Sequence, residues 1–181
     1  RNQKLVKNVT TTTTVDIDQP INLETTMESG QVFRWEEVQG WYIGVIGRDG
    51  YAIKQTSSGL LIRTSNPDKQ ATIKSIRNFF RLDDDLEKFY AELQHDQSLR
   101  EAFQHWRGLR LIKQDPWECL ISFVCSSVSN IPRIKKNLNS LAKAYGRPIY
   151  LANNTVYEFP SPRQLSKISV DDLLQLGLGF R

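Results

Sequence analysis

Short runs of β-branched and aromatic residues, broken by glycine, dominate the chain from residue 21 to residue 64. The dipeptide Asp49-Gly50 separates two of these runs and suits a tight hairpin turn, because its glycine accepts a positive φ. The pattern predicts an antiparallel meander. Its expected strands are residues 32–38, 41–47, 51–56 and 60–64, with turns at Gln39-Gly40, Asp49-Gly50 and Ser58-Gly59.

The spacing of apolar residues changes to three and four after Asn66-Pro67, which predicts amphipathic helices. The aspartates at 83–85 precede the second of these helices, where carboxylates cap free N–H groups; a metal site built from all three is the less favoured alternative. His95 and His105 have no partners at metal-ligand spacing and are expected at the surface. The apolar positions are Ile73, Ile76 and Phe80, then Leu86, Phe89, Tyr90 and Leu93.

Another helix is expected after Asp115, with Pro116 at its first position and Glu118 three residues after the cap, the pattern of a capping box. Residues 119–125 are apolar nearly all round, which predicts a buried helix. The next helix is expected to begin near Asn130. Its apolar stripe consists of Ile134, Leu138, Leu141, Ala142 and Tyr145.

These elements predict an α+β fold. Residues 1–20 form a lead-in segment or an edge strand, residues 21–108 an antiparallel β-sheet domain with flanking helices, and residues 109–181 the first helices of an all-α domain. One or two short helices are expected in residues 162–177. A helical domain needs more partners to cover its apolar stripes, and the chain begins at Arg1 without an initiator methionine, so we expect a fragment of a larger protein.

The composition adds exclusions. The chain has 181 residues, of which 39% are hydrophobic and 24% charged, which argues against disorder, collagen and coiled coil. No run approaches the roughly 18 apolar residues of a membrane helix, so no membrane partner is expected. Cys119 and Cys125 are too few for a disulfide scaffold and are expected to pack, which favours an intracellular protein. No zinc cluster, phosphate-binding loop or Ser/His/Asp set is evident, so no metal or cofactor is expected.

The basic residues are concentrated in the C-terminal region. Residues 1–108 hold 14 basic and 15 acidic residues, a balance of −1, whereas residues 109–181 hold 10 basic and 5 acidic, a balance of +5. Residues 125–147 carry five basic residues and no acidic one. Such a stretch attracts polyanions, although a solvated helix face is the simpler interpretation of charge alone.

Four segments together resemble, in order and spacing, the 8-oxoguanine DNA glycosylases of the helix-hairpin-helix superfamily. Residues 79–83 between them are similar to the family's usual link, and the likeness runs from about residue 21 to the last residue. The segments are residues 29–35 (Ser-Gly-Gln-Val-Phe-Arg-Trp), 114–118 (Gln-Asp-Pro-Trp-Glu), 125–134 (Cys-Ser-Ser-Val-Ser-Asn-Ile-Pro-Arg-Ile) and 176–181 (Leu-Gly-Leu-Gly-Phe-Arg).

The resemblance implies base excision repair. Members flip 8-oxoguanine out of duplex DNA, and a lysine after the helix-hairpin-helix motif attacks the sugar C1′ while an aspartate assists, so that a Schiff base and strand cleavage can follow. That motif, the lysine and the aspartate are expected beyond Arg181, so we expect no catalytic residue in this chain and no activity from it alone. The implied partners are duplex DNA with cytosine opposite the lesion and the rest of the same protein. We expect a monomer. We expect it to be located with the genome, in the cytoplasm and nucleoid or in a nucleus.

The resemblance also implies the site residues. Gly30 aligns with the glycine whose carbonyl accepts the N7–H of 8-oxoguanine, although a turn glycine is the alternative. Arg133 and Arg181 align with the arginines that hold the opposite cytosine; the alternative for both is phosphate contact or plain solvation. Phe180 aligns with an aromatic wedge, and its alternative is core packing. The full set expected to contact DNA is Val128, Ser129, Asn130, Ile131, Arg133, Phe180 and Arg181.

Val128 departs from the family pattern. The family usually has three asparagines where this chain has Val128-Ser129-Asn130, and the first of them fills the gap left by the flipped base and bonds to the orphaned cytosine. A valine fills space but donates no hydrogen bond, so we expect looser selection of the opposite base. Two rival functions stay open: a noncatalytic module that binds duplex DNA, and a glycosylase for alkylated bases, which would not need Gly30 in this motif.

Overall fold

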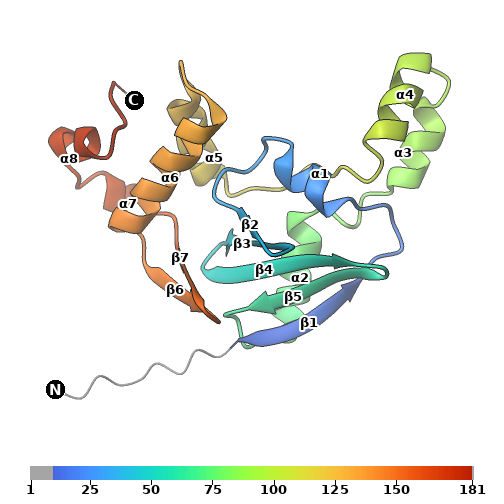
Figure 1. The fold of residues 1–181 in the computed structure, drawn as a ribbon, viewed down its shortest axis with the longest axis horizontal. Helices are drawn as coiled ribbons and strands as arrows, with labels where there is room; N and C mark the ends of the chain where they lie inside the picture. Colours follow the sequence, from blue (N-terminus) through green and yellow to red (C-terminus); the bar gives the residue numbers. More distant parts are fainter. Residues whose placement is uncertain (1–9, 181) are drawn as a thin grey trace.

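The computed structural model describes residues 10–180 and joins a five-stranded antiparallel sheet to a group of helices (Figure 1). The sheet order is β1-β5-β4-β3-β2. Strand β1 (Thr11–Asp16) pairs with β5 (Gly59–Thr64) at one edge of the sheet, which agrees with the edge-strand alternative for this part of residues 1–20; residues 1–9 lie outside the described range. The other strands are β2 (Glu36–Val38), β3 (Trp41–Ile46) and β4 (Asp49–Thr56).

The predicted meander is confirmed, but two of its turns lie elsewhere. Gln39 and Gly40 form a turn with φ of 53° and 78°, as expected of a tight hairpin. Asp49-Gly50 is not a turn: both residues are paired in β4, and the chain reverses at residues 47–48. The turn expected at Ser58-Gly59 falls one residue earlier, at residues 57–58, and residues 32–35 of the first expected strand are not in a strand.

Gly50 is a glycine because another hairpin lies against it. A Cβ at Gly50 would lie 3.1 Å from Val156 Cγ2 and 3.2 Å from Ile149 Cγ2. These residues belong to β6 (Pro148–Leu151) and β7 (Asn154–Tyr157), a two-stranded sheet that the sequence did not predict. The requirement at Gly50 is therefore close packing rather than backbone conformation.

The sheet domain has a closed hydrophobic core. Two helices contribute to it: α1 (Leu23–Glu28), which the sequence did not predict, and α2 (Lys69–Phe79), which it did. Trp35 packs on Phe79 with ring centroids 5.5 Å apart, and Phe79 on Phe80 at 5.0 Å. The fully covered residues of this core include Ile53, Leu60, Ile62, Ile76 and Phe80.

Helices α3 (Leu86–Leu93) and α4 (Gln97–His105) form a hairpin that projects away from the sheet (Figure 1). Asp85 caps α3 by accepting from the Lys88 N–H at 2.9 Å, as predicted. Asp83 instead pairs with Arg77 at 2.6 Å and Asp84 with Arg81 at 2.8 Å. No group of residues suited to a metal ion occurs within residues 10–180, and no helix in that range is long and apolar enough to cross a membrane.

The C-terminal region contains α5 (Pro116–Ser126), α6 (Ile131–Tyr145), α7 (Pro162–Leu165) and α8 (Val170–Gln175). The predicted stripe of α6 is confirmed: Leu138, Leu141 and Ala142 are buried. They pack with Cys125 and Leu178 in a second, smaller core, which Phe33 joins from the segment before the sheet.

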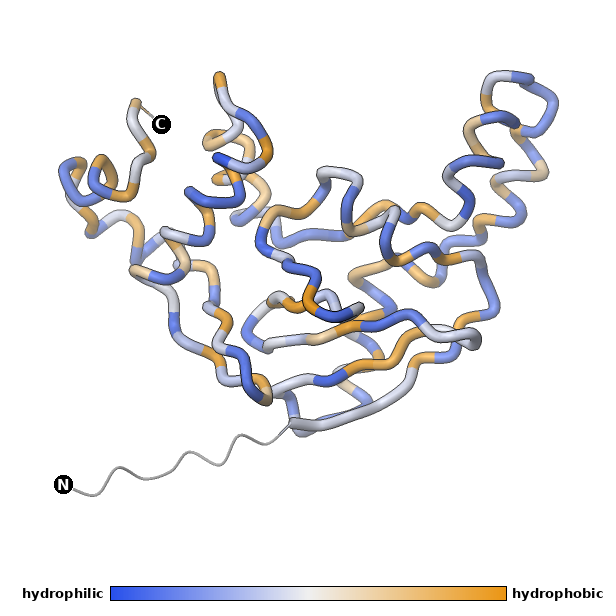
Figure 2. The backbone as a smooth tube through the Cα atoms, in the orientation of Figure 1, coloured by the Kyte–Doolittle hydropathy of each residue, from blue (hydrophilic) through white to orange (hydrophobic). Residues whose placement is uncertain are grey.

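Helix α5 is not the buried helix that its composition predicted. Only Ser122 and Cys125 are buried, whereas Leu120 is 53% and Phe123 75% exposed. Hydrophobic stretches of the tube in Figure 2 follow this helix as well as the sheet. Cys119, expected to pack, is exposed. The side of α5 that carries Leu120 and Phe123 therefore has no cover within residues 10–180.

The start of α5 differs from expectation in the hydrogen-bond partner of Glu118. Asp115 accepts from the N–H groups of Trp117 and Glu118, both at 3.0 Å, as predicted for the cap. The Glu118 carboxylate does not close a capping box. It binds Arg34 instead, with Nε–Oε1 at 2.7 Å and Nη2–Oε2 at 2.9 Å, because Arg34 is nearly buried and needs a partner for its charge.

Candidate nucleic-acid interface

Gly30 lies in the turn between α1 and β2 with φ of +82°, a conformation that side chains rarely adopt. A turn glycine and a glycine whose carbonyl contacts the lesion are therefore compatible interpretations, since a glycine in a turn also exposes its backbone. The Gly30 carbonyl oxygen accepts no hydrogen bond from any residue between 10 and 180. An acceptor that the protein itself does not use is available to a ligand.

Gln31 fixes this turn to a distant segment. Its side-chain amide donates to the Arg110 carbonyl and to Ser29 Oγ, both at 2.9 Å, and accepts from the Ile112 N–H at 2.9 Å. Ser29 Oγ in turn donates to the Thr26 carbonyl at 2.8 Å. The residues on both sides of Gly30 are thus held, so the orientation of its peptide groups is restrained.

Arg110 supports the segment to which Gln31 binds. Its side chain is buried, and its guanidinium donates to the carbonyls of Pro20 at 3.1 Å and Arg81 at 2.8 Å. Burial lowers the pKa of this guanidinium, while the nearby Asp84 acts in the opposite direction. Sequence reasoning missed Arg110 because the linear pattern carries no signal that a particular arginine is buried.

The segment after Gly30 connects the two regions of the molecule. Val32 and Trp35 belong to the core of the sheet domain, whereas Phe33 packs in the helical core. Arg34 binds Glu118 of α5 and donates to the Tyr157 carbonyl at 2.7 Å. The residues that resemble the family motif are therefore divided between the two regions: residues 32 and 35 pack in the sheet core, and residues 33 and 34 contact the C-terminal region.

The loop between α5 and α6 lies next to this turn. A Cβ built on Gly30 would be 3.9 Å from Ile131 Cδ1, so the structure brings these two predicted site residues together. Asn130 has a structural role, because its side chain caps α6 by accepting from the Arg133 N–H at 3.0 Å. Val128 is 89% exposed at φ 49°, and Ser129 Oγ is buried without a hydrogen-bond partner in the described chain.

The basic side of α6 faces outward. Arg133, Lys136 and Lys143 are exposed, and none of them forms an ion pair with another residue of the described range 10–180. Arg147 differs, since it pairs with Glu158 at 3.1 Å. Together with Lys135, which also forms no ion pair within residues 10–180, Arg133, Lys136 and Lys143 leave four positive charges on α6 to attract an anionic partner.

The segment after α8 contributes an exposed aromatic side chain. Leu178 is buried in the helical core, while Phe180 is 77% exposed. Arg181 lies outside the described residues. In Figure 1 this segment, the α5–α6 loop and the turn after α1 all lie on the same side of the molecule. We call the group formed by Gly30, residues 128–133 and Phe180 the loop face.

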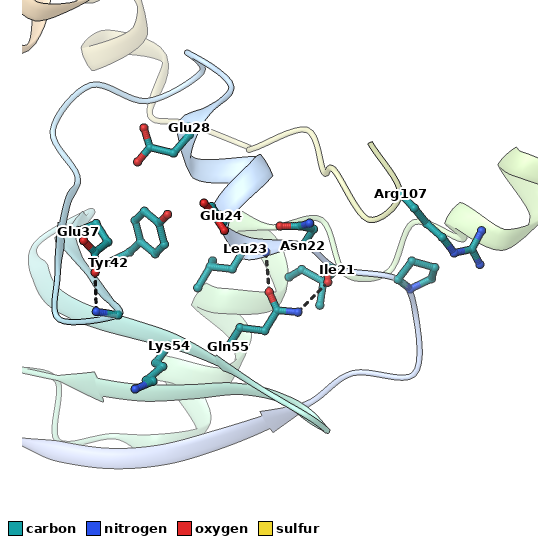
Figure 3. A pocket seen from close by; sticks show the side chains of 12 residues that line it. Ile21, Asn22, Leu23, Glu24, Glu28, Glu37, Tyr42, Lys54, Gln55 and Arg107 are labelled. Carbon is teal, nitrogen blue, oxygen red and sulfur yellow. Dashed lines mark hydrogen bonds between the residues drawn. The ribbon is translucent and has the colours of Figure 1, made fainter. Parts of the chain in front are cut away.

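A separate pocket of about 820 Å³ lies beside α1 and is lined by carboxylates (Figure 3). Tyr42 stands among Glu24, Glu28 and Glu37, and its pKa is raised, first by burial of the phenol and then by these negative charges. Glu37 also accepts from the Gly40 N–H. Lys54 and Arg107 also line this pocket, so its lining is mixed in charge, and it shares no lining residue with the loop face.

Comparison with solved structures shows the class of protein. The structure described as MBOgg1 in complex with a low-affinity DNA ligand aligns with a TM-score of 0.85 and 32% identity, over 96% of this chain and 59% of that chain. The Clostridium acetobutylicum 8-oxoguanine glycosylase/lyase, solved with double-stranded DNA, aligns with a TM-score of 0.81 over 93% of this chain and 60% of that one; at 24% identity this likeness concerns the fold alone. The predicted fold class is confirmed: it is that of the 8-oxoguanine DNA glycosylases.

The sequence comparison identifies the family. Residues 14–120 match the family described as 8-oxoguanine DNA glycosylase, N-terminal domain, and the chain belongs to this family, as its motifs indicated. It is 29% identical over 167 residues to the N-glycosylase/DNA lyase OGG1 of Arabidopsis thaliana, an alignment that covers 89% of this chain and 46% of that protein. The chain thus spans about half the length of this relative.

Proposed function

We propose that these residues form the N-terminal portion of an 8-oxoguanine DNA glycosylase with associated lyase activity, and that the loop face binds duplex DNA that carries 8-oxoguanine opposite cytosine. The observation that supports this most directly is the Gly30 carbonyl, which is unpaired within residues 10–180 and held by its neighbours. A protein of this kind acts where the genome is.

The chemical basis for selecting the lesion is a single hydrogen atom, the one on N7. 8-Oxoguanine carries a hydrogen at N7, whereas guanine presents a lone pair there. A fixed carbonyl gains a hydrogen bond with the first and meets repulsion with the second. The preference depends on rigidity, because a carbonyl that could rotate away would tolerate guanine. Gln31 and Ser29 supply that rigidity.

Arg133 and Phe180 are the proposed contacts on the strand opposite the lesion. A guanidinium donates in a forked pattern that suits the O2 and N3 acceptors of an unpaired cytosine. An exposed aromatic ring beside it can fill space where the bases are unstacked. Lys136 and Lys143 are proposed to contact phosphates. Arg181 is proposed to act with Arg133.

The covalent chemistry is proposed to come from a lysine and an aspartate outside these 181 residues. A lysine amine attacks C1′, the bond to the base breaks, and the resulting imine allows strand cleavage. Exposed lysines such as Lys136 and Lys143 are poorly suited to this role, because an ammonium in water stays protonated and is a weak nucleophile.

Gly30→Ala tests the proposal. The variant should lose most of the preference for an 8-oxoguanine duplex over the same duplex with guanine, measured as a ratio of dissociation constants by fluorescence anisotropy, while binding to undamaged DNA changes little. Since alanine is strained at positive φ, the melting temperature is measured alongside. A folded variant with an unchanged ratio would show that Gly30 is only a turn residue.

A noncatalytic DNA-binding module is the second candidate, favoured by the unpaired basic face of α6. It predicts binding that weakens steeply with salt but is equal for damaged and undamaged duplexes. The proposed enzyme predicts the same salt dependence together with a preference for the lesion. Trapping with borohydride separates them further: a protein that continues through the length of its relatives should form a covalent adduct with the lesion duplex, and the 181 residues alone should not.

A further inference from the structure

The pocket beside α1 is bordered by two carboxylates that the protein does not pair. Glu24 and Glu28 lie one turn apart on α1, so their side chains leave the same face of the helix. Neither forms an ion pair with another residue of the described range 10–180. Residues 16–42 carry six acidic residues and one basic residue, Arg34, which is already bound to Glu118. This part of the molecule is therefore negative, in contrast to α6.

Tyr42 adds a second, independent feature to the pocket. The residue is only 7% exposed, and its hydroxyl forms no hydrogen bond with any residue between 10 and 180. In Figure 3 this hydroxyl points toward the helix that carries Glu24 and Glu28. A polar group on a nearly buried side chain is normally paired, because leaving it unpaired costs free energy. The Tyr42 hydroxyl is thus free to bind a ligand that enters the pocket.

The carboxylates act on this hydroxyl through their charge. The pKa of Tyr42 is raised, first by burial of the phenol and then by the negative charges of Glu28, Glu24 and Glu37. Both carboxylates of α1 therefore lie within electrostatic range of the phenol oxygen. A cation placed between them would be attracted by both charges, and a cation with N–H groups could also donate a hydrogen bond to that oxygen.

The two basic residues of the lining do not fill this site. Arg107 pairs with Glu87 and lies at the far end of the pocket from Tyr42 (Figure 3). Lys54 lies near the turn between β2 and β3, where its Nζ would be 3.4 Å from a Cβ built on Gly40. The uncompensated negative charge of the pocket is therefore concentrated on α1.

The walls of the pocket are fixed and partly apolar. Gln55 of β4 donates to the Ile21 carbonyl at 2.9 Å and accepts from the Leu23 N–H at 2.7 Å, which ties the start of α1 to the sheet (Figure 3). Pro20 and Ile21 line the pocket together with Tyr42. An aliphatic stem can lie along these residues while its charged end reaches the carboxylates.

We propose that this pocket binds an alkylammonium group, with the nitrogen between Glu24 and Glu28 and one of its N–H groups donating to the Tyr42 hydroxyl oxygen. The same chemistry is carried by a lysine side chain of another protein and by a free polyamine. A metal ion is the poorer fit, because no group of three or more residues suited to a metal occurs within residues 10–180. The proposal goes beyond the proposed function and does not depend on it, since it involves no DNA.

The experiment is an NMR titration of the 181-residue protein, in which backbone amide shifts give dissociation constants. The cationic probes are putrescine, for a free polyamine, and Nα-acetyl-lysine methylamide, for a lysine side chain. Their neutral counterparts are butanediol and the same lysine probe acetylated at Nε. The variants are Glu28→Gln and Tyr42→Phe. The matched control is Glu36→Gln, which removes the same charge from a β2 residue that does not line the pocket.

Both cations should bind with a dissociation constant of about 1 mM or lower, with shifts centred on α1 and β3, and the neutral counterparts should not bind. Glu28→Gln should weaken binding about fivefold. Tyr42→Phe should weaken it about tenfold, because a hydrogen bond to a charged group is lost. The melting temperature of Tyr42→Phe should not fall, since the hydroxyl has no partner within residues 10–180. Glu36→Gln should change the affinity less than about twofold.

The two cationic probes distinguish the source of the ligand. Tighter binding of putrescine would assign the site to free polyamines, and tighter binding of the lysine probe to a partner protein; either result supports the ammonium site. Three results would overturn it: no shift with about 10 mM of either cation, equal binding of the neutral counterparts, or equal losses in Glu28→Gln and Glu36→Gln. Recognition of 8-oxoguanine is tested separately by Gly30→Ala.

Discussion

The sheet domain and the C-terminal helices differ in how completely they cover their apolar residues. In the sheet domain Ile53 and Ile62 are 0% exposed, enclosed by the strands and by α1 and α2. Among the C-terminal helices, α5 is covered at Cys125, whereas Phe123 on another side of the same helix is 75% exposed. Both regions contain strongly apolar segments, so the number of covering elements, and not composition, decides burial.

The difference shows where the structure depends on other segments. The sheet core closes with residues 10–112 and the family match covers most of it. The C-terminal helices are fixed to the sheet mainly through Arg34, Phe33 and the β6–β7 hairpin. The loop face draws residues from both regions, so its geometry depends on this connection.

The largest expected effect comes from breaking the connection itself. Glu118→Ala leaves the Arg34 guanidinium, whose side chain is 6% exposed, without its carboxylate partner. We expect a loss of about 3–5 kcal/mol of unfolding free energy, measured by urea denaturation. Asp83→Ala is the control, since it removes an exposed ion pair worth at most about 1 kcal/mol. Equal losses in the two variants would mean that the buried pair does not join the regions.

The next prediction compares the two regions directly. Ile62→Ala opens a cavity in the closed core and should cost about 2–5 kcal/mol. Phe123→Ser removes a larger apolar side chain from α5 but should cost no more than about 0.5 kcal/mol, because that side chain is already in water. Thermal unfolding of both variants checks this contrast. A large loss for Phe123→Ser would show that α5 is covered.

Gln31→Leu affects the turn that the sheet domain holds in place. The leucine leaves the Ile112 N–H and the Arg110 carbonyl without their partner, at a cost of about 1–3 kcal/mol. We expect the proposed preference for 8-oxoguanine over guanine to fall further than general DNA affinity, as judged by competition binding. Gln31→Glu keeps the length and the acceptor and should fall in between; a leucine variant with full preference would contradict the role of Gln31.

The smallest expected effect concerns pH. The raised pKa of Tyr42 means that the folded protein holds this phenol proton more tightly than the unfolded chain does. The corresponding stability is complete below the ordinary tyrosine pKa of 10.0 and is lost as pH rises through the folded-state pKa. Tyr42→Phe should therefore melt less pH-dependently between about pH 9 and about pH 11. Tyr51, whose pKa is also raised by burial, accounts for the residual dependence; an identical slope in the variant would contradict the prediction.

Local sequence patterns correctly predicted those features that are determined by residues close together in the sequence. The helix caps at Asp85 and Asp115 and the turn at Gln39-Gly40 agree with the structure because neighbouring residues determine them. The turn predicted at Asp49-Gly50 is wrong because the glycine is required there by close packing against β6 and β7, about a hundred residues away. The α1 helix has only six residues, too few to show a helical period.

The candidate site divides in the same way. Gly30 and residues 128–131 were found through motifs, and the structure places Gly30 beside Ile131. Gln31 lies inside the motif at residues 29–35, but its hydrogen bonds to residues 110 and 112 could not be inferred from sequence spacing. The exposure of α5 was missed because composition indicates what a helix could bury and not what is present to cover it.

The division of residues 32–35 between the two regions has a consequence for how distant substitutions act. Gly30 is attached on the sheet side through Gln31, while Val128 lies between α5 and α6, and Arg34, Phe33 and the β6–β7 hairpin join the two sides. A substitution at this joint is expected to change the spacing between Gly30 and the α5–α6 loop without opening either core. Residues remote from the loop face can therefore alter its shape while the secondary structure, and with it the circular dichroism, stays the same.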